Sequence, residues 1–259
     1  TGANNTAMGM CSLLANTTGA DNTATGVEAL KANTTGDSNV AVGYRALDSN
    51  TTGGTNIAIG SQAAHANTTG TDILVIGKNA YITGTTAANN TAIGNNSLAC
   101  NTTGSENTAV GLSTMFKNTE GANNVALGRS ALACNTTGSQ NIGIGKYAGC
   151  GITTGLDNVS IGRDSMTSSV TSNYNIGIGT QSLAALTSGV GNVALGFGSL
   201  KRNTSGDQNI SIGCRTMDAN TTGDCNTFVG KDAGLSNSEG GSNSGFGIKA
   251  GENVSTGGG

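Results

Sequence analysis

Residues 90–106 read N-T-A-I-G-N-N-S-L-A-C-N-T-T-G-S-E, and variants of this 17-residue block follow one another from Asn5 to Gly259 without an insertion or deletion. Fifteen blocks fill this stretch, each close to N-[TVI]-A-[IVL]-G-x-x-[AST]-[LM]-x-x-N-T-T-G-x-x. Self-similarity at a short fixed period is typical of solenoids, in which each unit buries its apolar face against its neighbours. We number the positions of the block 1 to 17, with Asn5 at position 1.

The composition indicates which solenoid this is. Seventeen residues are too few for two helices and a turn, and Gly and β-branched residues in every block disfavour helix. With 43 glycines, 3% aromatic residues and no Trp, the core must be thin. We therefore expect an all-β fold, a parallel β-solenoid (β-roll) of fifteen 17-residue coils, forming a single repetitive segment over residues 1–259 with its repeats in 5–259.

Positions 2 to 4 of each block predict a short strand, for example residues 91–93, in which alternate residues face opposite ways. Position 4, as at Ile93, is then predicted to form a core ladder. Position 3, which is small in thirteen of the fifteen blocks, is predicted to point away from that core and to pack against a neighbouring chain. The candidate inter-chain packing residues are Ala7, Ala24, Ala41, Ala58, Ala92, Ala109, Ala126 and Ala194.

Position 5 is Gly in every block, and we expect it to end the strand at a turn that needs positive φ or close backbone approach. The residues after it, such as Arg163-Asp164, carry much of the charge and predict a solvated edge. A second short strand is expected at positions 8 and 9, as at Ala46-Leu47, where it would supply the other half of the core. The structural turn residues are Gly9, Gly26, Gly43, Gly60, Gly77, Gly94, Gly111, Gly128, Gly145, Gly162, Gly179, Gly196, Gly213, Gly230 and Gly247.

The N-T-T-G motif at positions 12 to 15 predicts a tight turn, because Asn and Gly tolerate left-handed conformations. Stacked in register, the Asn columns that begin at Asn5 and Asn16 are expected to form amide ladders. Many of the position-12 residues also lie in N-x-[ST] sequons, which would carry sugars if the chain were secreted by a glycosylating host. Turn chemistry copied by duplication is the interpretation we favour. The candidate glycosylation residues are Asn16, Asn33, Asn50, Asn67, Asn101, Asn135, Asn203 and Asn220.

No constellation of catalytic residues stands out, so we expect no enzyme, no cofactor and no metal site. The one histidine, His65, lies in a variable column and is predicted to be a solvated surface residue, and the fifteen carboxylates show no repeated pair. The six cysteines form no CxxC motif and are expected to be thiols without a redox role, although Cys134 and Cys150 could approach each other. Two blocks, 73–89 and 158–174, depart from the consensus, which we interpret as tolerated drift.

The balance of charge limits the partners. Only 10% of residues are charged and the net charge is −3, so nothing draws the chain to nucleic acid. No apolar run approaches the roughly 18 residues of a membrane span, and no membrane insertion is expected.

The Thr columns allow an alternative function. Thr17, Thr34 and their equivalents form ranks spaced by one coil, similar to the flat Thr arrays of ice-binding β-solenoids. A monomeric ice- or surface-binding solenoid is therefore the alternative that we keep.

The consensus N-T-A-I-G-x-x-[AS]-L-x-x-N-T-T-G resembles the repeats of phage tail-fibre and related surface-fibre proteins, and its A-I-G core is similar to the head repeats of trimeric autotransporter adhesins. The resemblance covers Asn5 to Gly259 and implies left-handed coils and a homotrimer. It also implies a structural fibre or filament segment, extracellular on a virion tail fibre or a cell-surface filament, that meets a host-surface glycan or receptor. We further expect a piece of a longer fibre or a head-to-tail polymer, because open strand edges invite stacking.

Overall fold

The structure, a computed structural model, describes residues 2–256. The chain forms two compact units, Thr1–Arg129 and Ser130–Gly259. Within the described residues each unit is a parallel β-solenoid without helices, with one three-residue strand in every 17-residue coil. The all-β, parallel-solenoid fold expected from the sequence is thereby confirmed.

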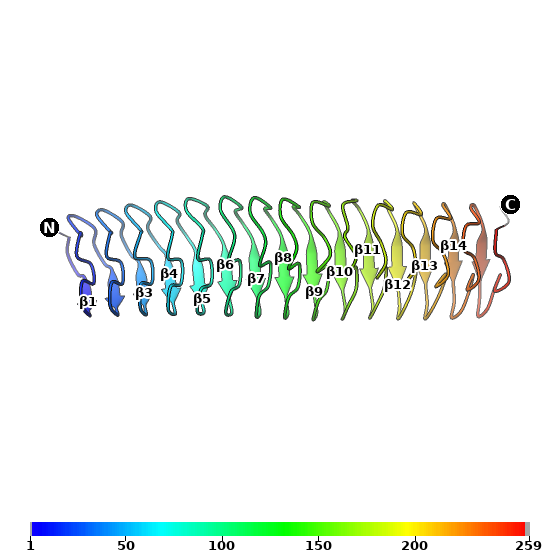
Figure 1. The fold of residues 1–259 in the computed structure, drawn as a ribbon, viewed down its shortest axis with the longest axis horizontal. Helices are drawn as coiled ribbons and strands as arrows, with labels where there is room; N and C mark the ends of the chain where they lie inside the picture. The colour runs from blue at the N-terminus through cyan, green and yellow to red at the C-terminus, as the bar shows by residue number, and fades with distance from the viewer. Residues whose placement is uncertain (1, 257–259) are drawn as a thin grey trace. The chain divides into compact units, whose positions relative to one another are not determined.

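The first unit contains eight strands, and each pairs in parallel with the next at an offset of one block, so that Thr6 lies opposite Thr23. Figure 1 shows these strands stacked in chain order from the blue end. The strands are β1 (Thr6–Met8), β2 (Thr23–Thr25), β3 (Val40–Val42), β4 (Ile57–Ile59), β5 (Leu74–Ile76), β6 (Thr91–Ile93), β7 (Thr108–Val110) and β8 (Val125–Leu127).

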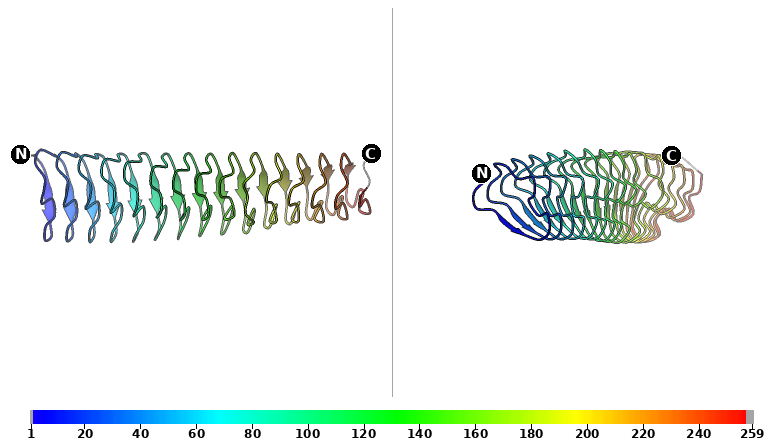
Figure 2. Two further views of the ribbon diagram at one scale, coloured as in Figure 1. Left: turned by 45° about the horizontal axis from the view of Figure 1, so that its top comes forward. Right: turned by 60° about the vertical axis from the view of Figure 1, so that its left-hand side comes forward.

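The second unit contains seven strands with the same parallel register, in which Val159 lies opposite Ile176. In the two views of Figure 2 the strand forms one side of each coil and irregular turns lead back to the next strand. The strands are β9 (Ile142–Ile144), β10 (Val159–Ile161), β11 (Ile176–Ile178), β12 (Val193–Leu195), β13 (Ile210–Ile212), β14 (Thr227–Val229) and β15 (Ser244–Phe246).

Positions 8 and 9 do not form the second strand that the sequence predicts. They lie in turns, because the position-9 residue has a left-handed backbone conformation, as at Leu30 with φ 49. The turns still bond from coil to coil, since the Leu30 amide donates to the Ala46 carbonyl at 3.0 Å. Leu30 and Leu47 are completely buried, so these positions do supply one wall of the core as expected.

The assignment of the two strand faces was wrong. Ala24, Ala41 and Ala126 at position 3 are 0% exposed inside their own chain, whereas Ile59 at position 4 is 39% exposed. The position-9 leucines on the opposite wall leave room only for a small side chain, so the narrow interior takes alanine and the β-branched residues face outward. The position-4 core ladder and the packing of the buried position-3 alanines against a second chain are therefore overturned: Ala24, Ala41, Ala58, Ala92, Ala109, Ala126 and Ala194.

Both predicted Asn ladders are present. At position 1 the Asn39 side chain donates to the Gly53 carbonyl at 2.9 Å, and its Oδ1 accepts the Asn56 amide of the next coil at 3.0 Å. At position 12 the Asn50 side chain donates to Asn33 Oδ1 at 3.0 Å. These buried carboxamides pair backbone groups that would otherwise be left without partners at high cost.

The two conserved glycines of the block serve different purposes. Gly at position 5 has positive φ throughout, for example 133 at Gly43, which confirms the turn prediction. Gly at position 15, such as Gly19, does not have positive φ, so the left-handed conformation expected for it is wrong. A Cβ at Gly19 would lie 2.6 Å from Asn16 Oδ1, and close approach to the amide ladder is the constraint there.

In the block 73–89, one departure from the consensus compensates for another. Gly84 stands where the ladder has Asn, and a Cβ there would overlap the ring of Tyr81, which replaces the usual Leu. Tyr81 is completely buried and its hydroxyl donates to the Ala87 carbonyl at 3.3 Å. Asn67 Oδ1, which would meet the missing Asn, is buried without a partner. The larger Tyr81 side chain therefore fills the space that the absent Asn side chain leaves at Gly84.

We predict that Tyr81→Leu and Gly84→Asn are strongly coupled. Gly84→Asn alone overpacks the core and should cost about 1–3 kcal/mol of unfolding free energy. Tyr81→Leu alone leaves a cavity and should cost about 2 kcal/mol. The double variant restores the consensus and a donor for Asn67 Oδ1, so its loss should be at least about 1 kcal/mol smaller than the sum of the two. Denaturant unfolding of the four proteins measures this, and additive losses would contradict it.

Candidate functional site

The outward face of the strands is the most regular surface in each unit. It consists of positions 2 and 4, whose side chains come from the two ends of every three-residue strand and lie on the same side. Neither position holds a charged residue in any block. We call these two columns the outer strand face.

In the second unit the outer strand face is aliphatic over five consecutive coils. Exposure along it stays moderate because neighbouring side chains shield one another, and it reaches 40% at Ile210 and 37% at Ile212. Backbone pairing fixes the side chains about 4.8 Å apart between coils and about 6.6 Å apart along a strand. The ten residues are Ile142, Ile144, Val159, Ile161, Ile176, Ile178, Val193, Leu195, Ile210 and Ile212.

The same face of the first unit is mixed. Ile57 and Ile59 are 38% and 39% exposed, but several strands place Thr at position 2, and Thr23 and Thr25 occupy both columns of β2. Thr hydroxyl groups thus interrupt the aliphatic side chains along this part of the face. Its capacity to bind an apolar partner is lower than that of the second unit.

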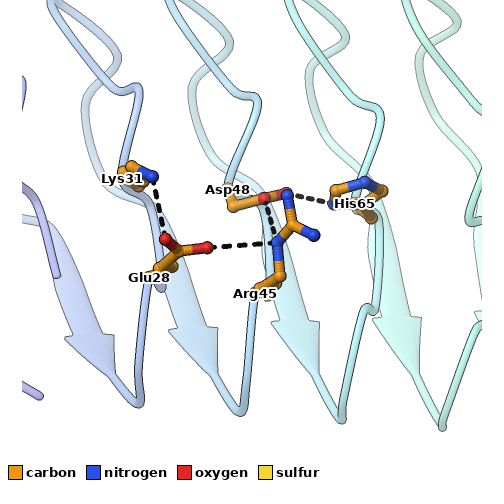
Figure 3. A network of polar contacts seen from close by, with 5 residues as sticks. All are labelled: Glu28, Lys31, Arg45, Asp48 and His65. Carbon is orange, nitrogen blue, oxygen red and sulfur yellow. Dashed lines mark hydrogen bonds and ion pairs between the residues drawn. The ribbon is translucent and has the colours of Figure 1, made fainter. Parts of the chain in front are cut away.

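A charged network lies on the edge formed by positions 7 and 10 in the first unit (Figure 3). Glu28 Oε1 lies 2.8 Å from Lys31 Nζ, and Glu28 Oε2 lies 3.2 Å from Arg45 Nε in the next coil. Arg45 Nε also meets Asp48 Oδ2 at 2.9 Å, and Asp48 Oδ1 contacts His65 Nδ1 one coil further. The solvated edge predicted from the charge is therefore a chain of ion pairs across three coils.

His65 belongs to this network. Its side chain is 26% exposed and paired with Asp48, whose own side chain is 5% exposed, so the expectation of a freely solvated histidine is wrong. No nucleophile accompanies it among the five residues of the network. The arrangement can bind neighbouring coils together, but it contains no acid–base relay to a reactive group.

The Thr ranks use their hydroxyls within the chain. Thr34 Oγ1 donates to the Thr51 carbonyl at 3.0 Å, and Thr51 Oγ1 donates to the Thr68 carbonyl at 3.0 Å. The same bond joins Thr204 to Thr221 in the second unit at 3.1 Å. These hydroxyls are committed to holding coils together, which leaves them less able to order external water.

The sequon asparagines are mostly buried, which agrees with the turn chemistry that we favoured over sugars on these residues. Their Nδ2 atoms, which a glycan would occupy, donate within the ladder, as from Asn33 to the Gly36 carbonyl at 3.0 Å. Asn16, in the first coil, is partly exposed but makes the same bond to the Gly19 carbonyl at 2.9 Å. The completely buried candidates are Asn33, Asn50, Asn67, Asn101, Asn135, Asn203 and Asn220.

Metal sites, pockets and membrane-spanning helices are the other features that could indicate a function. Within residues 2–256 no three His, Cys, Asp or Glu side chains are grouped to hold a metal ion, no pocket is present, and no helix is long and apolar enough to cross a membrane. The six cysteines are reduced; Cys225 is exposed and the other five are half-buried. No family model matches the sequence, and no curated protein or solved structure matches it either.

The Glu28 ion pair predicts a specific pH dependence. The hydrogen bond from Lys31 lowers the pKa of Glu28 below its ordinary 4.5. A carboxylate with a lowered folded pKa contributes stability that is fully present above its unfolded pKa and is lost as the pH falls through the folded value. Glu28→Gln should therefore reduce the loss of thermal stability on acidification below pH 4.5. Melting curves against pH measure this; an unchanged acid limb would contradict the assignment, and Glu239→Gln is the control.

Proposed function

We propose that the protein is a non-catalytic structural fibre or filament segment, the shaft of a virion tail fibre or of an extracellular, adhesin-like cell-surface filament. The bonding between coils is the observation that carries this proposal. Neighbouring coils bond to one another at several points around the coil, as when the Thr23 amide donates to the Asn39 carbonyl at 2.8 Å and the Thr34 amide donates to the Thr51 carbonyl at 2.8 Å. Dense bonding along one direction gives stiffness, which suits a mechanical role.

The proposal includes association of the chain with itself as a homotrimer of left-handed coils, the arrangement that the resemblance to fibre repeats implies. The outer strand face supports self-association and replaces the alanine column as the contact surface. Its eight strands in the first unit and seven in the second, each about 10 Å long and about 4.8 Å apart, offer about 380 Å² and about 340 Å². Each partner in a standard-size interface buries about 800 Å². Covering this face removes an apolar surface that a monomer would leave in water.

The variable turn residues serve a second part of the proposed function. Position 6 differs from coil to coil and includes exposed residues, with Tyr44 51% and Phe197 52% exposed. Such residues can contact a host-surface glycan or receptor without disturbing the core. Head-to-tail polymerisation through the strand edges would lengthen the fibre.

The alternative, a monomeric ice-binding solenoid built on the Thr ranks, has weaker support. Its hydroxyls donate to carbonyl groups of the next coil, as Thr102 Oγ1 does to Thr119 at 3.0 Å. A monomer that lowers the freezing point without changing the melting point would nevertheless favour it over the fibre.

We predict that the purified chain is a trimer, or a polymer of trimers, by light scattering. Ile176→Lys with Ile178→Lys puts charges in the middle of the five aliphatic coils of the second unit and should release monomers of 25.3 kDa. Thr222→Lys, on an exposed turn, is the matched control and should leave the mass unchanged. Circular dichroism confirms that each variant is folded. A wild-type monomer, or a double variant that stays trimeric, would contradict the proposed assembly.

A further inference from the structure

Position 11 of one coil lies directly beside position 10 of the next. The Ala32 amide donates to the Asp48 carbonyl at 2.9 Å, and the Ala185 amide donates to the Lys201 carbonyl at 3.0 Å. Neighbouring coils are about 4.8 Å apart and the two positions are offset by one residue of about 3.8 Å, so the Cα atoms of residues joined in this way lie about 6 Å apart. A disulfide bond spans Cα separations of about 4.4–6.8 Å. The stacking register therefore brings these two positions within bridging distance.

The side chain at position 11 also points the right way. Ser168 Oγ donates to the Ala184 carbonyl of the next coil at 3.0 Å, and Thr83 Oγ1 makes the same bond to the Ala99 carbonyl at 2.9 Å. The γ atom of position 11 therefore reaches toward position 10 of the following coil. A cysteine at position 11 would direct its sulfur to the same place.

Cys134 occupies position 11 and Cys150 occupies position 10 of the next coil, and both belong to the second unit. Both are half-buried and reduced. Burial, with smaller contributions from Cys134 and Asp164, raises the pKa of the Cys150 thiol to about 11. The electrostatic contribution of Cys134 agrees with the proximity that the register gives.

We propose that Cys134 and Cys150 form a disulfide bond between adjacent coils when the protein meets a small disulfide oxidant such as oxidised glutathione. One cysteine thiolate attacks a sulfur of the oxidant and releases one glutathione thiol. The second cysteine then attacks the resulting mixed disulfide and releases the other glutathione thiol. The two cysteines are oxidised, the oxidant is reduced, and the two thiol protons end on the two glutathione molecules.

The bond would reinforce a thin part of the core. In the coil 141–157, Gly149 stands where other coils place Leu, and Ile152 stands where the ladder has Asn. The Ile152 backbone forms an isolated parallel bridge with Val170, and the Ile152 side chain cannot make the amide bond of the ladder. A covalent link across one coil constrains the unfolded chain at a coil that lacks the position-12 Asn.

The test exposes the folded, full-length protein to oxidised glutathione, followed by alkylation of free thiols and peptide mapping without reduction. The expected result is one cross-linked peptide pair joining Cys134 to Cys150 with the loss of two hydrogens, while the other four cysteines are alkylated. Because the pKa of Cys150 is about 11, the bond should form faster as the pH is raised toward that value. The melting temperature should rise on oxidation and return on reduction.

Matched variants keep the proposal falsifiable. Cys134→Ser and Cys150→Ser should each abolish both the cross-link and the rise in melting temperature, whereas Cys100→Ser, at position 11 of another coil, should change neither. Glutathione adducts that persist on Cys134 and Cys150, a cross-link between two chains, or pairing with another cysteine would each overturn the proposal.

Discussion

The structure depends on the constant 17-residue offset between coils. Every strand residue lies opposite its equivalent in the next block, so that Val40 pairs with Ile57 and Ala41 with Ala58. The Asn side chains at positions 1 and 12 convert this offset into buried hydrogen bonds that only another carboxamide or backbone group in register can complete. A single inserted residue would put the coil that contains it out of register with its neighbours, and each buried Asn of that coil that lost its partner would cost about 1–3 kcal/mol. The absence of insertions over fifteen blocks follows from this constraint.

Much of the fold can be predicted from the sequence because the period is visible in it. The coil length, the strand at positions 2 to 4, the turn at the position-5 glycines and the Asn ladders all follow from pattern and residue type. Strand alternation shows that positions 3 and 4 face opposite ways, but it does not show which one faces inward. That choice depends on the width of the coil, which the leucines at position 9 determine from the opposite wall. These leucines have a left-handed backbone conformation, as at Leu47 with φ 50. Leucine rarely adopts this conformation, so the residue type does not predict it.

The total volume of the side chains inside a coil stays similar even where the residue types change. Phe228 replaces the usual Ala at position 3, and Gly234 and Gly245 are small where the ring needs space; a Cβ on either would lie within 3 Å of it. Tyr81 and Gly84 show the same exchange in the first unit. The departure of the block 73–89 looked like drift in the sequence because Tyr81 and Gly84 lie in different columns. In the structure they are paired, which indicates that the thin core tolerates change only when both walls change together.

The limited volume of the core does not restrict the outer strand face. The residue types on that face therefore need another explanation. Thr, Val and Ile all suit an exposed strand, and the first unit uses Thr freely at position 2. In β9 to β13 both outer positions are Ile, Val or Leu in every coil, with no Thr among them. β-propensity does not require this choice, and the buried core does not contact it. The self-association that we propose would impose that restriction, because a second copy of the chain would cover this face and exclude water from it.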